Sequence, residues 1–357
     1  MNKNLLLLAF LCAFVLYSCK KSGEEPQGVT TPVTPPPTTP VTITPPPAFG
    51  FYVVSYFPSY RDINLVSDSR FKMCNVVCYA FATLSSTGAL TVASPSVLSA
   101  VVVKAKRTGT KVMISLNGDA ADWKTMAATA TGRTNYIKKV MNTVRTYDLQ
   151  GVDVDWEFPS TADGTDITYT ALMKELSDSC HVNAKYYLTA TLTSGKYVGS
   201  YTNAIKDEIL KGVYVDFFNI MAYDDFNTSV PYRQHSNYAL AQTCLNYWVT
   251  TRGLPASKAV LGMPAYGRPS GITQSGTILS YSGILGQGGS ALSDSAVVTA
   301  GGFTNYKIYY NGMPTIKKKT MLAKSMANGI MFWEMGQDTN DGTCLLKAAC
   351  DTIGRAY

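Results

Sequence analysis

Histidine and charge are both scarce in this chain of 357 residues. Only two histidines occur, His181 and His235, and 15% of the residues are charged, whereas about 25% is usual for a soluble domain. Two distant histidines nearly exclude a histidine-rich metal centre, and they leave few candidates for a Ser-His-Asp triad. The cysteines show no metal-ligand spacing either, so the sequence predicts no metal site.

Clusters of one charge are also missing. The net charge is +7, from 31 Lys and Arg against 24 Asp and Glu, and one tight cluster stands out, Lys317–Lys319, which we expect to be the solvated start of a helix. A nucleic-acid groove needs a clustered basic stripe, so no nucleic-acid partner is expected. The 23 tyrosines suit uncharged polar partners such as sugars.

Long apolar runs are absent apart from one near the N-terminus, Leu5 to Leu16, which is too short to span a membrane. Lys3 precedes this run and Ser18-Cys19 follows it. Residues 1–19 therefore resemble the signal of a bacterial lipoprotein, with Cys19 as the lipidated new N-terminus. Ordinary signal cleavage beside an incidental cysteine is the alternative. We expect a protein of the cell envelope, held at the outer membrane or cell surface by a lipid on Cys19, or a secreted one.

The next segment is rich in proline and threonine. Pro26 to Pro47 holds nine prolines and seven threonines. Such a tract cannot bury apolar surface, and it favours extended polyproline conformations. We expect residues 20–48 to form a disordered stalk between the signal and one folded domain, residues 49–357.

Six cysteines lie in the folded part: Cys74, Cys78, Cys180, Cys244, Cys344 and Cys350. Cys74 and Cys78 are too far apart along a predicted strand to pair with each other. We expect most of the six to be small buried apolar residues. A Cys344–Cys350 disulfide remains an open alternative.

Short β-branched and aromatic runs alternate with segments of helical periodicity. The predicted strands are residues 51–57, 75–82, 111–117, 151–158, 186–192, 213–223, 258–266 and 329–335. The clearest helical segments are residues 136–147, 169–180, 238–252 and 316–327. This α/β pattern fits a single (β/α)8 TIM barrel. The alternative fold, a doubly wound sheet, would have a glycine-rich phosphate-binding loop after its first strand. The corresponding segment here, Phe57-Pro58-Ser59-Tyr60, does not resemble such a loop.

The most informative segment is the fourth predicted strand, which contains Asp153, Asp155, Trp156 and Glu157. Alternate residues of a strand share a face, so the three acids point into the barrel and Trp156 points away. Desolvation and mutual repulsion oppose the joint ionisation of the three acids. A row of buried acids with only a structural role would therefore be costly. Repulsion should keep at least one proton in the cluster. Glu157, nearest the strand end, is therefore a candidate general acid.

These residues resemble glycoside hydrolase family 18, which contains chitinases and endo-β-N-acetylglucosaminidases. Its motif DxxDxDxE is matched here by Gln150-Gly151-Val152-Asp153-Val154-Asp155-Trp156-Glu157, with Gln150 in place of the first acid. Met221, Tyr223 and Asp224 match the family's M-x-Y-D element. Further segments resemble its second, third, seventh and eighth strands: residues 79–82, 115–118, 258–268 and 329–334. The resemblance covers residues 50–357.

The resemblance implies a retaining mechanism in which the substrate's 2-acetamido oxygen attacks its own C1. Glu157 would act first as acid and then as base. Asp155 would turn toward Glu157 and the acetamido N–H. Asp153 would tune Asp155, with Ser115 and Tyr56 as hydrogen-bond donors around it. No metal or organic cofactor is implied.

Further roles follow from the same resemblance. Tyr223 would be the fourth catalytic residue and would donate its hydroxyl to the acetamido oxygen. Taken alone, an inward Trp at a strand end is more often core, and a strand-end Arg is often a surface ion pair. The substrate-binding residues implied are Trp333, Asp224, Met221, Tyr266 and Arg268.

This mechanism requires an N-acetyl group, so the expected partner is a GlcNAc-containing oligo- or polysaccharide. Trp156 in the motif resembles chitinases more than enzymes that cleave N-glycans. An endo-β-N-acetylglucosaminidase and a non-hydrolytic glycan-binding protein stay open as alternatives, although the presence of Glu157 argues against the latter. Deep-groove chitinases carry a larger inserted α+β domain where this chain has Pro269–Asn328. We therefore expect a shallower cleft and an endo-acting monomer.

Overall fold

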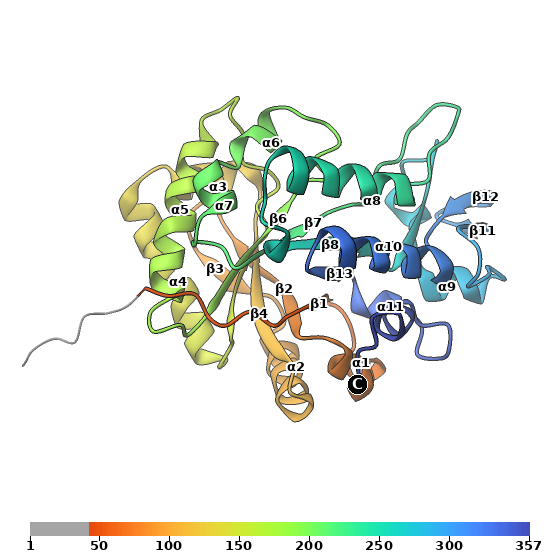
Figure 1. The fold of residues 1–357 in the computed structure, drawn as a ribbon, viewed down its shortest axis with the longest axis horizontal. Helices are drawn as coiled ribbons and strands as arrows, with labels where there is room; N and C mark the ends of the chain where they lie inside the picture. The colour runs from red at the N-terminus through yellow and green to blue at the C-terminus, as the bar shows by residue number, and fades with distance from the viewer. Residues whose placement is uncertain (1–42) are drawn as a thin grey trace, which may run out of the picture. The chain divides into compact units, whose positions relative to one another are not determined.

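The computed structural model describes residues 43–357, and the predictions made for residues 1–42, which include the export signal and Cys19, lie outside the described residues. Eight parallel strands form the centre of the fold (Figure 1): β1 (Tyr52–Pro58), β2 (Val76–Leu84), β4 (Lys111–Asn117), β5 (Gly151–Val154), β6 (Tyr187–Leu192), β7 (Phe217–Ile220), β8 (Ala259–Pro264) and β13 (Gly329–Trp333). Pairing of β1 with both β2 and β13 closes the ring. The predicted (β/α)8 TIM barrel is confirmed.

Helices connect and surround the strands (Figure 1). They are α1 (Asp68–Met73), α2 (Pro95–Thr108), α3 (Ala120–Ala127), α4 (Ala130–Thr146), α5 (Thr165–Cys180), α6 (Ser200–Ala204), α7 (Asp207–Lys211), α8 (Tyr238–Leu245), α10 (Met313–Met326) and α11 (Leu345–Ile353). Polar side chains cap several helices, as Thr129 does for α4 and Asn237 for α8. Within residues 43–357, no helix combines the length and apolar character needed to cross a bilayer.

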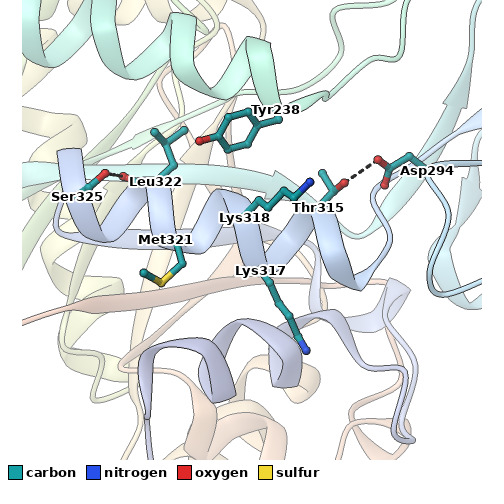
Figure 2. Close-up of a pocket in the computed structure, with 8 residues that line it drawn as sticks. All are labelled: Tyr238, Asp294, Thr315, Lys317, Lys318, Met321, Leu322 and Ser325. Carbon is teal, nitrogen blue, oxygen red and sulfur yellow. Dashed lines mark hydrogen bonds between the residues drawn. The ribbon is translucent and has the colours of Figure 1, made fainter.

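The lysine run of α10 differs from the prediction. Lys317 and Lys318 are exposed and line an outer groove of about 810 Å³ that also includes Tyr238 (Figure 2). Lys319 is fully buried instead. The expectation that all three lysines are solvated is therefore wrong for Lys319, because the helical turn places it on the inward face with Ile316.

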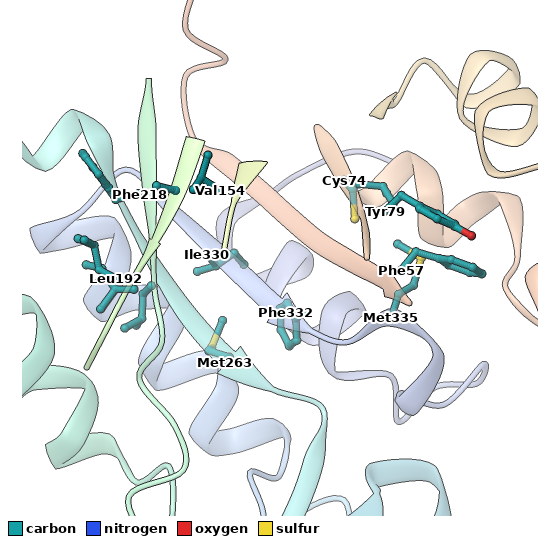
Figure 3. Packing of buried hydrophobic residues seen from close by; sticks show 14 of the residues in the cluster. Phe57, Cys74, Tyr79, Val154, Leu192, Phe218, Met263, Ile330, Phe332 and Met335 are labelled. Carbon is teal, nitrogen blue, oxygen red and sulfur yellow. The ribbon is translucent and has the colours of Figure 1, made fainter. Parts of the chain in front are cut away.

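Two apolar layers follow from the alternation along each strand. Residues that face outward pack against the helices, including Val154, Phe218 and Phe332 on three different strands (Figure 3). Residues that face inward fill the barrel, and they include Val54, Cys78, Met113, Val260 and Met331. The barrel is thus a packed core, and a ligand can be admitted only at an end of the strands.

The segment between β8 and β13 forms a small antiparallel sheet that the sequence analysis did not foresee (Figure 1). Its strands are β9 (Tyr266–Pro269), β10 (Leu279–Ser280), β11 (Ser295–Ala300) and β12 (Phe303–Tyr309), in the order β10-β9-β12-β11, with α9 (Tyr281–Gly286) beside them. A further short strand, β3 (Leu90–Val92), pairs antiparallel with β2. The sheet matters for the site because β9 carries Tyr266 and Arg268.

The chain before β1 contacts the N-terminal end of the barrel. Ile43 forms a β-bridge with Val182. The hydroxyl of Tyr187, the first residue of β6, donates to the backbone oxygen of Pro47 at 2.8 Å. Phe49 stacks on the same tyrosine with ring centroids 4.9 Å apart. Residues 43–49 are therefore attached to the end of the barrel where the strands begin, so residues 43–48 do not belong to the disordered stalk expected for residues 20–48.

Cysteine pairing is absent from the described part of the chain. Each of the six cysteines predicted for the folded part is buried and unpaired: Cys74, Cys78, Cys180, Cys244, Cys344 and Cys350. The alternative of a Cys344–Cys350 disulfide is not realised, because Cys344 Sγ instead lies 3.1 Å from Asp338 Oδ2. These cysteines pack as small apolar residues.

Candidate active site

Asp153 lies at the centre of a buried hydrogen-bond network inside the barrel. Parallel pairing places Ser115 of β4 and Thr189 of β6 in register with it. Its carboxylate accepts four hydrogen bonds: from Tyr56 Oη at 2.7 Å, Ser115 Oγ at 2.8 Å, Thr189 Oγ1 at 2.6 Å and Asn219 Nδ2 at 3.4 Å. Burial raises the pKa of Asp153, and these four bonds limit the rise. The two predicted donors, Tyr56 and Ser115, are both in contact with it.

Asp155 follows the last residue of β5 and is 4% exposed. Thr191 Oγ1 donates to its Oδ1 at 2.8 Å, and Asn117 Nδ2 donates to its backbone oxygen at 3.1 Å. Burial, followed by the charges of Glu157 and Asp153, raises the pKa of Asp155 well above its ordinary value. The carboxyl group is thus prepared to hold a proton or to share one with a neighbour.

Glu157 stands where this row of acids reaches solvent. Its side chain is exposed at the mouth of a cavity, while Trp156 points the opposite way and stacks on Trp123 with ring centroids 5.0 Å apart. This stack anchors the backbone that carries Glu157. Partial desolvation and then the charge of Asp224 raise the pKa of Glu157. A raised carboxyl pKa is what a general acid requires near neutral pH.

The cavity lies at the carboxyl ends of the strands and has a volume of about 260 Å³. It is lined by Tyr56, Phe81, Asn117, Asp155, Glu157, Thr191, Met221, Tyr223, Asp224, Tyr266 and Trp333. The Trp333 ring lies between Tyr56 and Phe81, with centroid separations of 5.3 and 5.8 Å. This supported ring offers a flat apolar face of the kind that packs on a sugar.

Tyr223 and Asp224 follow β7 and enter the cavity opposite the acids. Asp224 adopts a left-handed backbone with φ of 64°. Its Oδ1 accepts from Tyr266 Oη at 2.7 Å and lies 3.3 Å from Arg268 Nη1. Burial alone would raise the pKa of Asp224, but its contacts with His235, Tyr266 and Arg268 together lower it. Asp224 is therefore held as a carboxylate.

Arg268 does not line the cavity itself. Its guanidinium lies 4.0 Å from the centroid of the Phe226 ring and contacts Asp224 from behind. Among the predicted substrate-binding residues, the structure brings Trp333, Asp224, Met221 and Tyr266 to the cavity wall. Arg268 contacts Asp224 without lining the cavity itself.

His235 is a neighbour of Asp224 that the sequence analysis left unassigned. The backbone N–H of Asp224 donates to His235 Nδ1 at 3.4 Å, and the same nitrogen lies 3.5 Å from Asp224 Oδ1. The imidazole is fully buried, and its Nε2 has no hydrogen-bond partner among the described residues. Burial lowers the pKa of His235.

The other histidine takes part in a buried Ser-His-Asp arrangement. Ser177 Oγ lies 2.9 Å from His181 Nδ1, and His181 Nε2 lies 3.2 Å from Asp216 Oδ2. Ser177 is 1% exposed and belongs to α5, so no substrate can reach it. Asp216 also accepts from the backbone N–H of Leu188 at 2.7 Å. This array joins helix to sheet and provides no hydrolytic site.

A second cavity, of about 430 Å³, adjoins the first and shares Glu157, Met221, Tyr223 and Asp224 with it. Its remaining walls are Phe158, Thr193, Ser194, Tyr197, Tyr201 and Asp225. Asp225 accepts from Tyr197 Oη at 2.8 Å and pairs with Lys196 and Arg233. These contacts join the loops after β6 and β7 into one wall. The aromatic residues of this wall were not singled out from the sequence.

Gln150 replaces the first acid of the motif and binds the neighbouring strand. Its Oε1 accepts from the backbone N–H of Val112 at 2.9 Å, and its Nε2 donates to the backbone oxygen of Asp148 at 2.6 Å. The side-chain amide therefore connects the start of β5 to β4. The substitution lies far from the cavity lining and leaves the catalytic end of the strand formed.

A parallel barrel with acidic side chains at one strand end, beside an aromatic floor, has the features of a glycoside hydrolase. Comparison with known families agrees with this class. The chain belongs to glycoside hydrolase family 18, because the family described as Glycosyl hydrolases family 18 matches residues 51–338.

Individual relatives support this assignment. Chitotriosidase-1 of Mus musculus is 29% identical over 242 residues, which cover 60% of this chain and 50% of the mouse protein. The chain thus spans about half the length of that relative. The crystal structure of a GH18 chitinase from the chitin utilization locus of Flavobacterium johnsoniae gives a TM-score of 0.70 at 29% identity, covering 85% of this chain and 94% of that one. A class V chitinase mutant from Nicotiana tobaccum, solved with NAG4, gives 0.70 at 20% identity over 86% and 100% of the two chains, and shows the fold alone.

Proposed function

We propose that this protein hydrolyses β-1,4-linked N-acetylglucosamine chains, such as chitin and chitooligosaccharides, by a retaining and substrate-assisted mechanism. The observation that carries the proposal is the shared cavity in which Asp155, Glu157 and Tyr223 meet above the Trp333 ring. A pyranose packed on Trp333 would have its reducing-end bond at Glu157. The mouse and Flavobacterium relatives, named chitotriosidase and chitinase, favour the same substrate class.

In this mechanism Glu157 donates a proton to the glycosidic oxygen and later removes one from water. Its exposure at the mouth of the cavity gives water access, and its raised pKa keeps the acid form available. The retaining step uses the acetamido oxygen of the substrate as the nucleophile. No second carboxylate of the protein then has to attack C1.

Asp155 and Tyr223 would align that acetamido group. The raised pKa of Asp155 favours a short hydrogen bond between Asp155 and either Glu157 or the acetamido N–H. Burial raises the pKa of Tyr223 well above its ordinary value, so its hydroxyl stays a donor for the acetamido oxygen. Asp153, fixed by its four donors, would help to keep a proton on Asp155, because its charge raises the pKa of Asp155.

Endo-action is supported by the two adjoining cavities. Glu157 lines both of them, with the Trp333 cavity on one side and the Phe158–Tyr201 wall on the other. Sugar units can therefore lie on both sides of the bond that Glu157 protonates. Space on both sides of that bond is a requirement for cleavage within a chain.

The test compares the wild-type protein with Glu157→Gln on chitopentaose, read by mass spectrometry. We expect di- and trisaccharides from wild type and a turnover lower by about 10²–10⁴ in the variant, the range for a lost general acid. The variant should still bind the sugar.

Intact chitopentaose with folded wild-type protein would exclude the proposal, and a glycoprotein substrate in parallel would reveal N-glycan cleavage. An early product with the β-anomer in excess would establish retention.

We further propose that the protein acts as a monomer at the cell envelope, attached by a lipid on Cys19. The support is the sequence pattern of residues 1–19, an apolar run that ends at Ser18-Cys19. Several acyl chains on one terminus anchor a protein durably. Light scattering tests the monomer, and the anchor is tested by substitution of Cys19.

A further inference from the structure

Behind the cavity wall formed by residues 223–224 lies a polar layer that the proposed mechanism does not use. Ser236 Oγ donates to the backbone oxygen of Ala222 at 2.7 Å. The backbone N–H of Asp225 donates to the backbone oxygen of His235 at 2.9 Å. The dipeptide His235-Ser236 thus holds the chain immediately before and immediately after the wall residues.

Lys319 anchors this dipeptide from α10. Its Nζ donates to the backbone oxygen of Ser236 at 2.6 Å, to Ser236 Oγ at 2.8 Å and to Asn311 Oδ1 at 2.6 Å. An ammonium group has three donors, and each one meets a neutral oxygen here. The side chain is fully buried. A methionine or leucine would fill such a site without the cost of burying a charge, so the lysine calls for an explanation.

We infer that Lys319 is a positioning residue for the proposed hydrolysis, and that it acts as an ammonium, through Ser236, to keep Tyr223 and Asp224 directed at the substrate. This inference rests on the proposed function. Loss of the proton to solvent leaves Nζ with two donors and a lone pair. The Ser236 hydroxyl would then turn to donate to Nζ and would abandon the backbone oxygen of Ala222, which releases the wall.

The titration of this site falls in a useful range. Burial lowers the pKa of Lys319 to about 7, while Cys244 of α8 and Asp294 before β11 act in the opposite direction. The pKa of the Cys244 thiol is itself raised to about 12 by burial, so that thiol is neutral. His235, on the returning loop, also faces Lys319, and its pKa is lowered mainly by its own burial. Activity should therefore fall as the pH rises above about 7.

Stability should change in the opposite direction over the same range. The lysine binds its proton more weakly in the folded protein than in the unfolded chain, so deprotonation between about pH 7 and 10 favours folding. If Lys319 only supported the fold, activity and stability would change in the same direction as the pH rises. If Lys319 positions the cavity wall, activity declines with rising pH while the free energy of unfolding increases.

The experiment compares wild type with Lys319→Met, Ser236→Ala and the exposed control Lys318→Met, each as the full chain. For each protein, kcat/KM on chitopentaose is measured from about pH 5 to 9, and hydrogen exchange of residues 222–225 is followed by mass spectrometry. Wild type and Lys318→Met should lose kcat/KM about 3- to 10-fold across pH 7, the effect of one net hydrogen bond. Lys319→Met and Ser236→Ala should start lower at pH 6, keep only the alkaline decline that deprotonation of Glu157 causes, and exchange faster at residues 222–225.

An unchanged alkaline decline in both Lys319→Met and Ser236→Ala would overturn the inference. So would activity losses that only mirror losses of stability. If Lys319→Met does not fold, Ser236→Ala carries the test, because it removes a single hydroxyl. If wild type hydrolyses no oligosaccharide, the proposed function is wrong, but the role of Lys319 in holding residues 222–225 is still tested by hydrogen exchange. Equal exchange of these residues in wild type and Ser236→Ala at pH 6 would refute that role.

Discussion

Replacement of Tyr56 by Phe would test how the barrel supports its innermost acid. Tyr56 Oη donates to Asp153 Oδ2 at 2.7 Å, and both side chains are buried. The variant removes this donor, together with the acceptor of the 3.1 Å hydrogen bond from Asn219 Nδ2, and leaves the ring against Trp333. Because a hydrogen bond to a charged group contributes about 1.5–3 kcal/mol net, we expect the free energy of unfolding to fall by about that amount where Asp153 is ionised.

The pH dependence of this loss has a definite sign. The bond favours the ionised form of Asp153, so its removal raises further a pKa that burial already raises. The full loss is expected above the folded-state pKa of Asp153, where the carboxylate is charged in both proteins. As the pH falls through that pKa, Asp153 becomes neutral, and the loss should shrink to the ~0.5–1.5 kcal/mol of an uncharged hydrogen bond.

Urea unfolding followed by tryptophan fluorescence at neutral and acidic pH measures both quantities. Tyr136→Phe is the matched control, because Tyr136 is equally buried but its hydroxyl has no partner among the described residues. Removal of an unpaired hydroxyl should cost little. If Tyr56→Phe behaves like Tyr136→Phe, or if its loss is the same at both pH values, Asp153 is not the charged acceptor described above.

Two further substitutions test the proposed sugar-binding role of Trp333 and the proposed lipid anchor on Cys19. Trp333→Ala removes the ring at the base of the cavity and should lower kcat/KM about 30-fold, equivalent to ~2 kcal/mol for a buried aromatic contact; an unchanged value in oligosaccharide kinetics would show that the sugar does not rest there. Cys19→Ala removes the predicted acylation site, so the variant should incorporate no labelled palmitate and should leave the membrane fraction. Labelling that persists would place the acyl chain on another residue.

Local rules were sufficient to predict the acidic row. A strand alternates its side chains whatever the fold around it, so the residue pattern by itself places Asp153 and Asp155 inside the barrel and Trp156 outside. The contacts of Thr189 and Thr191 could not be predicted in this way. They depend on which residues of β5 and β6 lie in register, and closure of the whole barrel sets that register.

Lys319 and His235 illustrate two different limits of sequence reasoning. Lys319 belongs to a run of three lysines that suggests exposure, although the helical period groups it with Ile316 and Thr320, which are buried. That signal was present in the sequence. His235 lies on a loop that returns toward Asp224, and no periodic pattern encodes the path of a loop. The strands of the small antiparallel sheet were missed for two reasons. β9 and β10 have only four and two residues, and β11 and β12 are mostly exposed or half-buried, so no strong apolar alternation marks them.

The contacts of Pro47 and Phe49 with Tyr187 have a mechanical consequence. They lie where β6 begins, whereas the cavity opens at the opposite ends of the strands. A force transmitted along residues 43–49 would act on the N-terminal ends of the barrel strands. It would not act directly on the loops that form the cavity at the carboxyl ends. A force applied at Ile43 would therefore act on the end of the barrel opposite the cavity.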